Sequence, residues 1–200
     1  MPWPFSVLYK SPSGNNPRAG FGLIELMISI SIMVIVAGIV LARQTSFNGA
    51  VLLRGQAYEI ALKIREVQLT AVSASDTTGG VNFRSALGVN FNTDPSFDKQ
   101  YISFSDVNGN DSYQPGTDID FGQRGVIDER FYISLIEIDG SSETDASVVF
   151  ERPNFDAEFS QVGSEMIVHI RRVGSNPATD MGPGDLRRIE ITSTGQIGVI

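Results

Sequence analysis

The most hydrophobic part of the chain is one uninterrupted segment, residues 21–42, in which Glu25 is the only charged residue. A helix of this length rises about 33 Å at about 1.5 Å per residue, which is enough to cross a hydrocarbon core of about 30 Å. The pattern therefore predicts a membrane-spanning helix with a carboxylate near its start. A carboxylate inside the bilayer costs on the order of 2.5–3.5 kcal/mol, so we expect Glu25 to have a specific purpose.

A second helical pattern follows within residues 43–75. After a polar stretch at 43–49, apolar residues recur at spacings of three and four, which is typical of an amphipathic helix packed on a domain. Glu59 and Lys63 stand four residues apart, in the favourable order for an ion pair on the outer side. Turn residues at 73–80 predict the end of the helix. The apolar positions assigned mostly to one face are Leu53, Ala57, Ile60, Ala61, Ile64, Val67, Leu69 and Ala71.

Beyond Gly80 the pattern changes to short alternating runs separated by turn dipeptides, which indicates strands. No helical pattern intervenes, and this favours an antiparallel sheet. The sequence thus predicts an α+β fold, in which one long N-terminal helix packs on a C-terminal antiparallel β-sheet within a globular domain of residues 81–200. The predicted strands are 81–83, 87–91, 101–104, 131–138, 147–150, 166–170, 188–192 and 196–200.

Charge is distributed unevenly along the chain. The formal net charge is −8, and Lys10 and Arg18 give residues 1–20 a charge of +2, which leaves −10 for residues 21–200. So acidic a chain is poorly suited to nucleic acids, whose binding depends on basic side chains that meet phosphates. The chain has no cysteine, which excludes disulfides, thiol catalysis and cysteine-based zinc sites.

The residues before the apolar segment indicate a processing signal. The small pair Ala19-Gly20 directly precedes Phe21, and Glu25 is the fifth residue counted from Phe21. In an ordinary secretory signal the apolar stretch precedes the cut and is lost, whereas a cut after Gly20 keeps the helix on the mature chain. The basic residues before the helix favour a cytoplasmic leader and an external domain. A plain signal-anchor helix with an unrelated acid remains the alternative.

The pattern of Gly20, Phe21 and Glu25 resembles the prepilin cleavage motif of type IV pilins and pseudopilins. The resemblance implies that a prepilin peptidase removes the leader, residues 1–20, after Gly20 and methylates the new amine of Phe21. It also implies the pilin fold and a single-pass protein of the inner membrane. An inner-membrane platform and motor would then assemble the protein, with other pilin subunits, into a periplasmic or extracellular filament. The runs ALGVNF, VVFERPNF and RRIEITSTGQIGV further resemble the minor-pilin class related to pseudopilin H.

Glu25 has a physical role in such a polymer. Cleavage leaves Phe21 with a free amine, which is positive near neutral pH. The carboxylate of one subunit then pairs with the amine of a neighbour inside a low-dielectric bundle. Because buried ion pairs contribute more to specificity than to stability, we expect this pair to set the axial register of the subunits.

An aspartate-rich stretch is a candidate calcium site. Calcium takes about six to eight oxygen ligands from carboxylates, amides and backbone carbonyls. A cysteine-free exported domain also gives a metal a stabilising purpose. The spacing departs from that of an EF-hand, and the same composition favours a solvated turn, so both interpretations stay open. The predicted ligands are Asp106, Asn108, Asn110, Asp118 and Asp120.

The sequence offers no constellation for catalysis. His169 is the only histidine and lies in an alternating run, where a structural role on a strand face is expected. No histidine-paired nucleophile and no phosphate-binding glycine loop is found. We therefore predict a non-enzymatic structural subunit of a type IV pilus or related filament. The alternatives are a type II secretion pseudopilin and a minor pilin that primes or tips the filament and binds a ligand.

Overall fold

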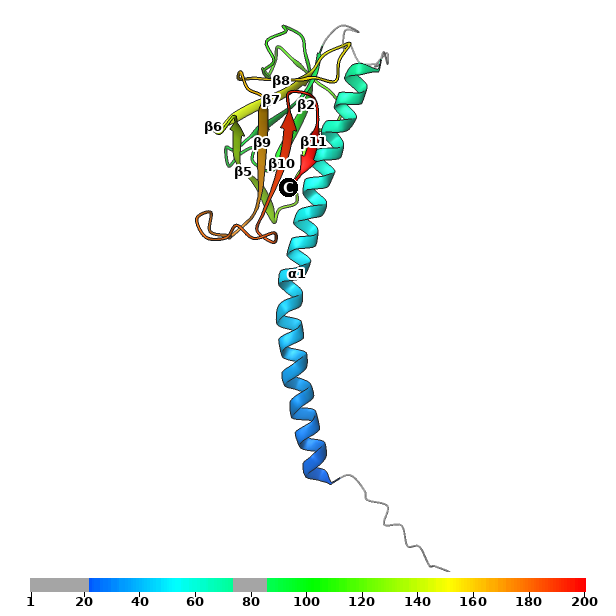
Figure 1. Cartoon of the computed structure of the whole chain (residues 1–200), viewed down its shortest axis with the longest axis vertical. Coiled ribbons are helices and arrows are strands. Elements are labelled where there is room, and N and C mark those ends of the chain that lie inside the picture. Colours follow the sequence, from blue (N-terminus) through cyan, green and yellow to red (C-terminus); the bar gives the residue numbers. More distant parts are fainter. Residues whose placement is uncertain (1–21, 74–85) are drawn as a thin grey trace, which may run out of the picture. The chain divides into compact units, whose positions relative to one another are not determined.

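The computed structural model describes residues 22–73 and 86–200, apart from the side chains of 42–48. The chain divides into two compact units, Met1–Arg43 and Gln44–Ile200, called here the first and the second unit. One helix, α1 (Leu23–Val72), has residues in both units (Figure 1). Helical structure continues through residues 43–49, where the polar stretch lies, and ends three residues before the predicted boundary at 75.

The β-strands all belong to the second unit. They are β1 (Ala86–Asn92), β2 (Gln100–Asp106), β3 (Ile119–Asp120), β4 (Gly125–Val126), β5 (Phe131–Ile138), β6 (Ser141–Glu143), β7 (Asp145–Phe150), β8 (Ala157–Phe159), β9 (Glu165–Arg172), β10 (Leu186–Thr192) and β11 (Ile197–Val199). Every predicted strand from residue 87 onward has a counterpart here, and 131–138 is predicted to the residue. The predicted strand at 81–83 lies outside the described residues.

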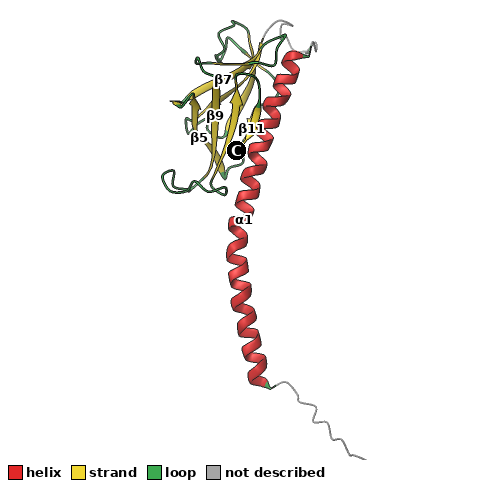
Figure 2. Ribbon diagram, in the orientation of Figure 1, coloured by secondary structure: helices red, strands yellow, loops and turns green. Residues whose placement is uncertain are grey.

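The strands form two antiparallel sheets (Figure 2). The first has the order β3-β2-β1-β7-β8, with β4 also paired to β2, and the second has the order β11-β10-β9-β5-β6. The predicted α+β class with antiparallel strands is confirmed, and the structure divides the strands between two sheets. Alternation along a strand shows which side chains are buried, and it does not show which strands pair: β7 returns to β1, whereas β9 joins β5.

The core of the second unit is formed by the sheets together with one face of α1. Inward-facing side chains of both sheets, such as Phe91, Ile133 and Val168, belong to the same buried cluster as Ile60 and Ile64 of the helix. Gly88 in β1 leaves room on the other face of the first sheet, because a Cβ there would lie 2.8 Å from the ring of Phe104. The helix thus completes a core that the sheets share.

Candidate functional site

The part of α1 in the first unit has the composition of a membrane span. Leu23–Leu41 has a mean hydropathy of 2.6, and none of it is buried. Its length of 19 residues corresponds to about 29 Å of helix, close to the hydrocarbon thickness of a bilayer. An apolar surface of this extent requires lipid or other apolar helices around it.

Glu25 lies in the first turn of this segment. Its backbone N–H donates to Gly22 O over 3.0 Å, and its backbone oxygen accepts the Ser29 hydroxyl over 2.8 Å. A carboxylate at this end of a helix is favoured by the helix dipole. Within the described part of the chain the Glu25 carboxylate has no hydrogen bond and no ion pair. The predicted cleavage junction, Gly20 and Phe21, lies outside the described residues, so the predicted partner amine does as well.

In the second unit, one face of α1 is buried against the sheets. Its apolar members confirm most of the predicted face, and they follow one another at spacings of three and four. They are Leu53, Ala57, Ile60, Ile64, Val67 and Ala71. Leu69, which the sequence placed with them, is 53 % exposed and belongs to the opposite side of the helix.

That opposite side carries a second row of apolar side chains, here called the outer stripe: Val51, Tyr58, Leu62 and Leu69. They are 53 %, 43 %, 69 % and 53 % exposed, respectively. Because they are spaced seven, four and seven residues apart, they fall within about 40° of one another at about 100° per residue. This part of α1 is therefore apolar on two opposite faces.

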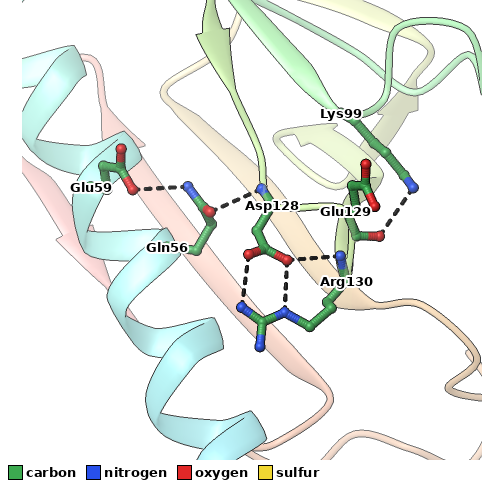
Figure 3. Close-up of polar contacts among 6 residues, drawn as sticks. All are labelled: Gln56, Glu59, Lys99, Asp128, Glu129 and Arg130. Atoms are coloured by element: carbon green, nitrogen blue, oxygen red, sulfur yellow. Dashed lines mark hydrogen bonds and ion pairs between the residues drawn. The ribbon is translucent and has the colours of Figure 1, made fainter.

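Two buried glutamines attach the helix to loops of the second unit. Gln56 accepts the backbone N–H of Asp128 over 3.1 Å and donates to Glu59 over 3.2 Å, as Figure 3 shows. Gln68 donates to the backbone oxygens of Phe155 and Gly195, both over 2.9 Å. The predicted Glu59–Lys63 pair is wrong, because Lys63 instead pairs with Glu66 at 3.1 Å. Polar contacts from α1 therefore reach the loops between strands and oppose rotation of the helix about its axis.

Asp128, next to this contact, is held by a close neighbour. Arg130 donates to both carboxylate oxygens of Asp128, at 2.8 and 2.7 Å (Figure 3). These charge-assisted hydrogen bonds hold the pKa of Asp128 well below its usual range. Asp128 also accepts the backbone N–H of Arg130 over 2.9 Å, so its carboxylate bridges the turn that presents the backbone N–H of Asp128 to Gln56.

The end of α1 is closed by a basic side chain. Arg152 donates through Nε to the backbone oxygen of Ala71 over 2.8 Å. The last carbonyls of a helix have no partner within the helix, and a cation at this end also favours the helix dipole. Arg152, which follows β7, thus supplies a donor to one of these carbonyls.

The aspartate-rich loop between β2 and β3 is closed by its own hydrogen bonds. Asp106 accepts the backbone N–H groups of Gly109 and Asp111 at 2.7 and 2.8 Å. Asp118 accepts those of Val107 and Gln114 at 3.1 and 2.7 Å. Each carboxylate thus accepts two backbone N–H groups of the loop and stabilises its turns.

The remaining predicted calcium ligands also have partners within the loop. Asn108 donates to Gln114 over 3.0 Å, and the Asn110 side chain accepts the N–H of Ser112 over 3.2 Å. Asp120 accepts the hydroxyl of Tyr113 over 2.7 Å and pairs with Arg124. In the described ranges, no group of three or more acidic or histidine side chains is arranged to hold a metal ion. The geometry favours the second of the two interpretations, the turn, and calcium binding stays untested.

His169 lies on the face of β9 turned away from the core. Its Nε2 is 2.6 Å from Glu137 on β5, and the side chain is largely buried. Burial lowers the pKa of the imidazole, although Glu137 acts in the opposite direction. The histidine is therefore neutral near pH 7 and satisfied by a structural hydrogen bond.

Comparison with known proteins identifies the N-terminal segment. Residues 15–41 match the family model of the prokaryotic N-terminal methylation motif. This motif is the signature of type IV pilins and pseudopilins, which are structural proteins that prepilin peptidase processes and that assemble with other pilins. The chain thus carries the signature of a type IV pilin-like or pseudopilin subunit, which with the apolar helix indicates membrane anchoring before assembly.

The match ends before the second unit. It covers none of residues 42–200, so the likeness to the pseudopilin H class stays a prediction. Neither a curated protein nor a solved structure matches the chain significantly. The outer stripe is the feature that the sequence interpretation missed, although its spacing of seven, four and seven is visible in the sequence.

Proposed function

We propose that the chain is a structural subunit of a type IV pilus or a related filament. A prepilin peptidase cuts after Gly20 and methylates Phe21. Before assembly the mature protein resides in the inner membrane as a single-pass protein, with its acidic domain on the side away from the cytoplasm. A membrane platform and motor then transfer it into the filament, where the apolar segment contacts other subunits instead of lipid.

The observation that carries this proposal is the second apolar face of α1. The domain buries only one face of the helix, which leaves Val51, Tyr58, Leu62 and Leu69 exposed. An exposed row of large apolar side chains on a helix marks a surface for another protein or a membrane. Packing of helices from neighbouring subunits supplies such a partner, and it does so without unfolding the domain.

The first unit supports the same function independently. Leu23–Leu41 has no buried residue, and the Glu25 carboxylate has no partner in the described part of the chain. Neighbouring subunits in a filament supply partners for both. Their apolar helices bury the Leu23–Leu41 surface, and the Phe21 amine of one of them pairs with the Glu25 carboxylate. The secretion pseudopilin shares these requirements and remains the second candidate.

Immunogold labelling of intact cells with an antibody against residues 86–200 tests the proposal. Label along surface filaments is the expected result, and a strain without prepilin peptidase serves as the control in which this label disappears. Label at filament tips alone would assign the minor-subunit role. Label confined to the cell envelope in the presence of the peptidase would reject the pilus and favour the pseudopilus.

A further inference from the structure

A pocket of about 290 Å³ opens on the first sheet, on the side of β1, β2 and β7. The side chains of Leu87, Val89 and Phe91 point from β1 into the core. Because side chains alternate along a strand, Asn90 and Asn92 point to the opposite face, where they line the pocket. The pocket is therefore separated from the core by the sheet itself and does not involve α1.

The floor of the pocket is a preorganised polar cluster. Asn90 and Asn92 donate their side-chain amides to the two oxygens of Asp145, at 2.8 and 2.7 Å. Asn90 is only 4 % exposed, and its amide oxygen accepts no hydrogen bond within the described part of the chain. This oxygen belongs to a side chain that lines the pocket, where a ligand donor can reach it.

The aspartate-rich loop forms one wall. Asp106 and Asp118 hold the loop closed through backbone N–H groups, and the N–H of Tyr113 donates to Ser147 of β7 over 3.1 Å. These contacts place Tyr113 and Pro115 at the pocket. The composition that suggested a metal site thus has another use, which is to hold an aromatic residue beside the polar floor.

The opposite wall combines an exposed aromatic ring with further planar polar groups. Phe97 is 48 % exposed and lines the pocket, as does Gln100 of β2. Arg124 also lines it, but Asp120 already compensates its charge at 3.1 Å. The site therefore has no excess positive charge for a phosphate, and its volume lies at the low end of ligand pockets, about 300–1,000 Å³.

Flat amide, carboxylate and guanidinium groups provide paired donors and acceptors for adjacent hydroxyl groups. An exposed aromatic ring covers the apolar C–H face of a ring-shaped ligand. We propose that this pocket binds a saccharide and holds a single sugar ring. Phe97 stacks on the ring, and the hydrogen-bonding residues are Asn90, Gln100 and Asp145. The site does not depend on filament formation, so it stands or fails separately from the proposed function.

Saturation-transfer NMR on the full chain tests the proposal. The chain is held in micelles of a detergent without a sugar headgroup, because a glycoside detergent would compete. The probes are free glucose, galactose, mannose, fucose, N-acetylglucosamine and N-acetylgalactosamine at millimolar concentration. We expect transfer to at least one sugar, and Phe97→Ala to weaken its binding by about five- to tenfold.

The matched control is Phe155→Ala, since Phe155 is 49 % exposed and does not line the pocket. This variant should bind as the unmodified chain does. Gln100→Ala is a second variant. It removes a proposed hydrogen bond to the sugar, so we expect weaker binding with little effect on folding. No transfer to any of the six sugars, or equal loss in Phe97→Ala and Phe155→Ala, would overturn the proposal. Transfer to zwitterionic amino acids in place of sugars would overturn the ligand class.

Discussion

Gln68 of α1 donates its side-chain amide to the backbone oxygen of Gly195, 127 residues further along the chain, over 2.9 Å. The same amide group donates to the backbone oxygen of Phe155 at 2.9 Å. Gly195 has φ of 77° in the turn between β10 and β11, and a Cβ at this position would collide with Phe155 O and with Gln68. The glycine therefore lets the last turn of the chain lie directly on the helix.

Replacement of Gln68 by alanine should destabilise the domain by about 1–3 kcal/mol, because the buried Gly195 carbonyl and the partly buried Phe155 carbonyl lose their donor. Thermal and urea melts of the full chain in micelles, followed by circular dichroism, measure the change. Gln196→Ala is the matched control, since Gln196 is exposed in the same turn, and we expect it to stay within about 0.5 kcal/mol of the unmodified chain. Equal midpoints for the two variants would contradict the role of the Gln68 contacts.

Replacement of Leu62 by glutamine separates assembly from folding. Leu62 is 69 % exposed, so we expect the melting midpoint to stay within the range of surface substitutions, about 0.5 kcal/mol. The variant should nevertheless be absent from sheared filaments, because the outer stripe gains a polar group. Lys63→Gln, on the neighbouring position outside the stripe, should assemble normally. Filaments that contain the Leu62 variant at the usual level would remove the stripe from the mechanism.

Glu25→Ala should leave membrane insertion intact and abolish filament formation. Removal of a carboxylate makes insertion more favourable, whereas the neighbouring Phe21 amine loses its counter-ion. Membrane fractionation and electron microscopy of sheared filaments measure the two effects. Ser29→Ala is the control, because the Ser29 hydroxyl only donates to the Glu25 backbone over 2.8 Å. Normal filaments from the Glu25 variant would exclude the proposed ion pair.

His169 should make the domain less stable in mild acid. Burial lowers its pKa below the ordinary value of 6.5, so the unfolded chain takes up a proton at a higher pH than the folded chain. The contribution is fully present above about pH 6.5 and is lost as the pH falls towards the folded pKa. Glu137, Arg171 and Arg188 surround the imidazole, and of these only Glu137 opposes the shift.

The comparison that isolates this effect is a melting series from pH 7.5 to pH 5 on the unmodified chain and on His169→Asn. The asparagine keeps a donor for Glu137 and does not titrate. We expect the midpoint of the variant to fall less over this interval. Parallel curves would show that other groups, such as the carboxylates, cause the whole pH dependence.

The aspartate-rich loop should stay closed without a metal. Asp106 and Asp118 each accept two backbone N–H groups, so we expect the same melting midpoint with calcium and with chelator. Asp106→Ala should lower the stability by about 2 kcal/mol in both conditions, since it leaves two N–H groups without an acceptor. A midpoint that rises with calcium, and that no longer does so in the Asp106 variant, would instead establish the calcium site.

The sequence predicts well those features that depend on local periodicity. The strand at 131–138 is found to the residue, because it is rich in β-branched and aromatic residues and the turn pair Asp139-Gly140 follows it, although its alternation is interrupted between Ile133 and Leu135. The face of α1 at Leu53, Ile60 and Ile64 is predicted because its apolar residues recur at spacings of three and four. Leu69 is misplaced because this helix has apolar residues on two sides, whereas a search for one apolar face assigns every apolar position to it.

Local periodicity does not predict features that depend on pairing between segments distant in the sequence. The division into two sheets rests on β7 pairing with β1 and on β9 pairing with β5, and no periodicity specifies these partners. The pocket on the first sheet likewise joins Asn90, Phe97, Tyr113 and Asp145 from separate segments. The aspartate-rich composition indicates a candidate metal site in the loop between β2 and β3. The hydrogen bonds show that Asp106 and Asp118 fix the backbone conformation of this loop.

The two apolar faces of α1 serve two separate steps, folding and assembly. The face that packs against the sheets is buried when a single chain folds, and this requires no other molecule. The outer stripe remains exposed until another molecule binds to it. A subunit built in this way can enter or leave a polymer as a finished part, because the surfaces that hold its own shape are not those that join it to its neighbours.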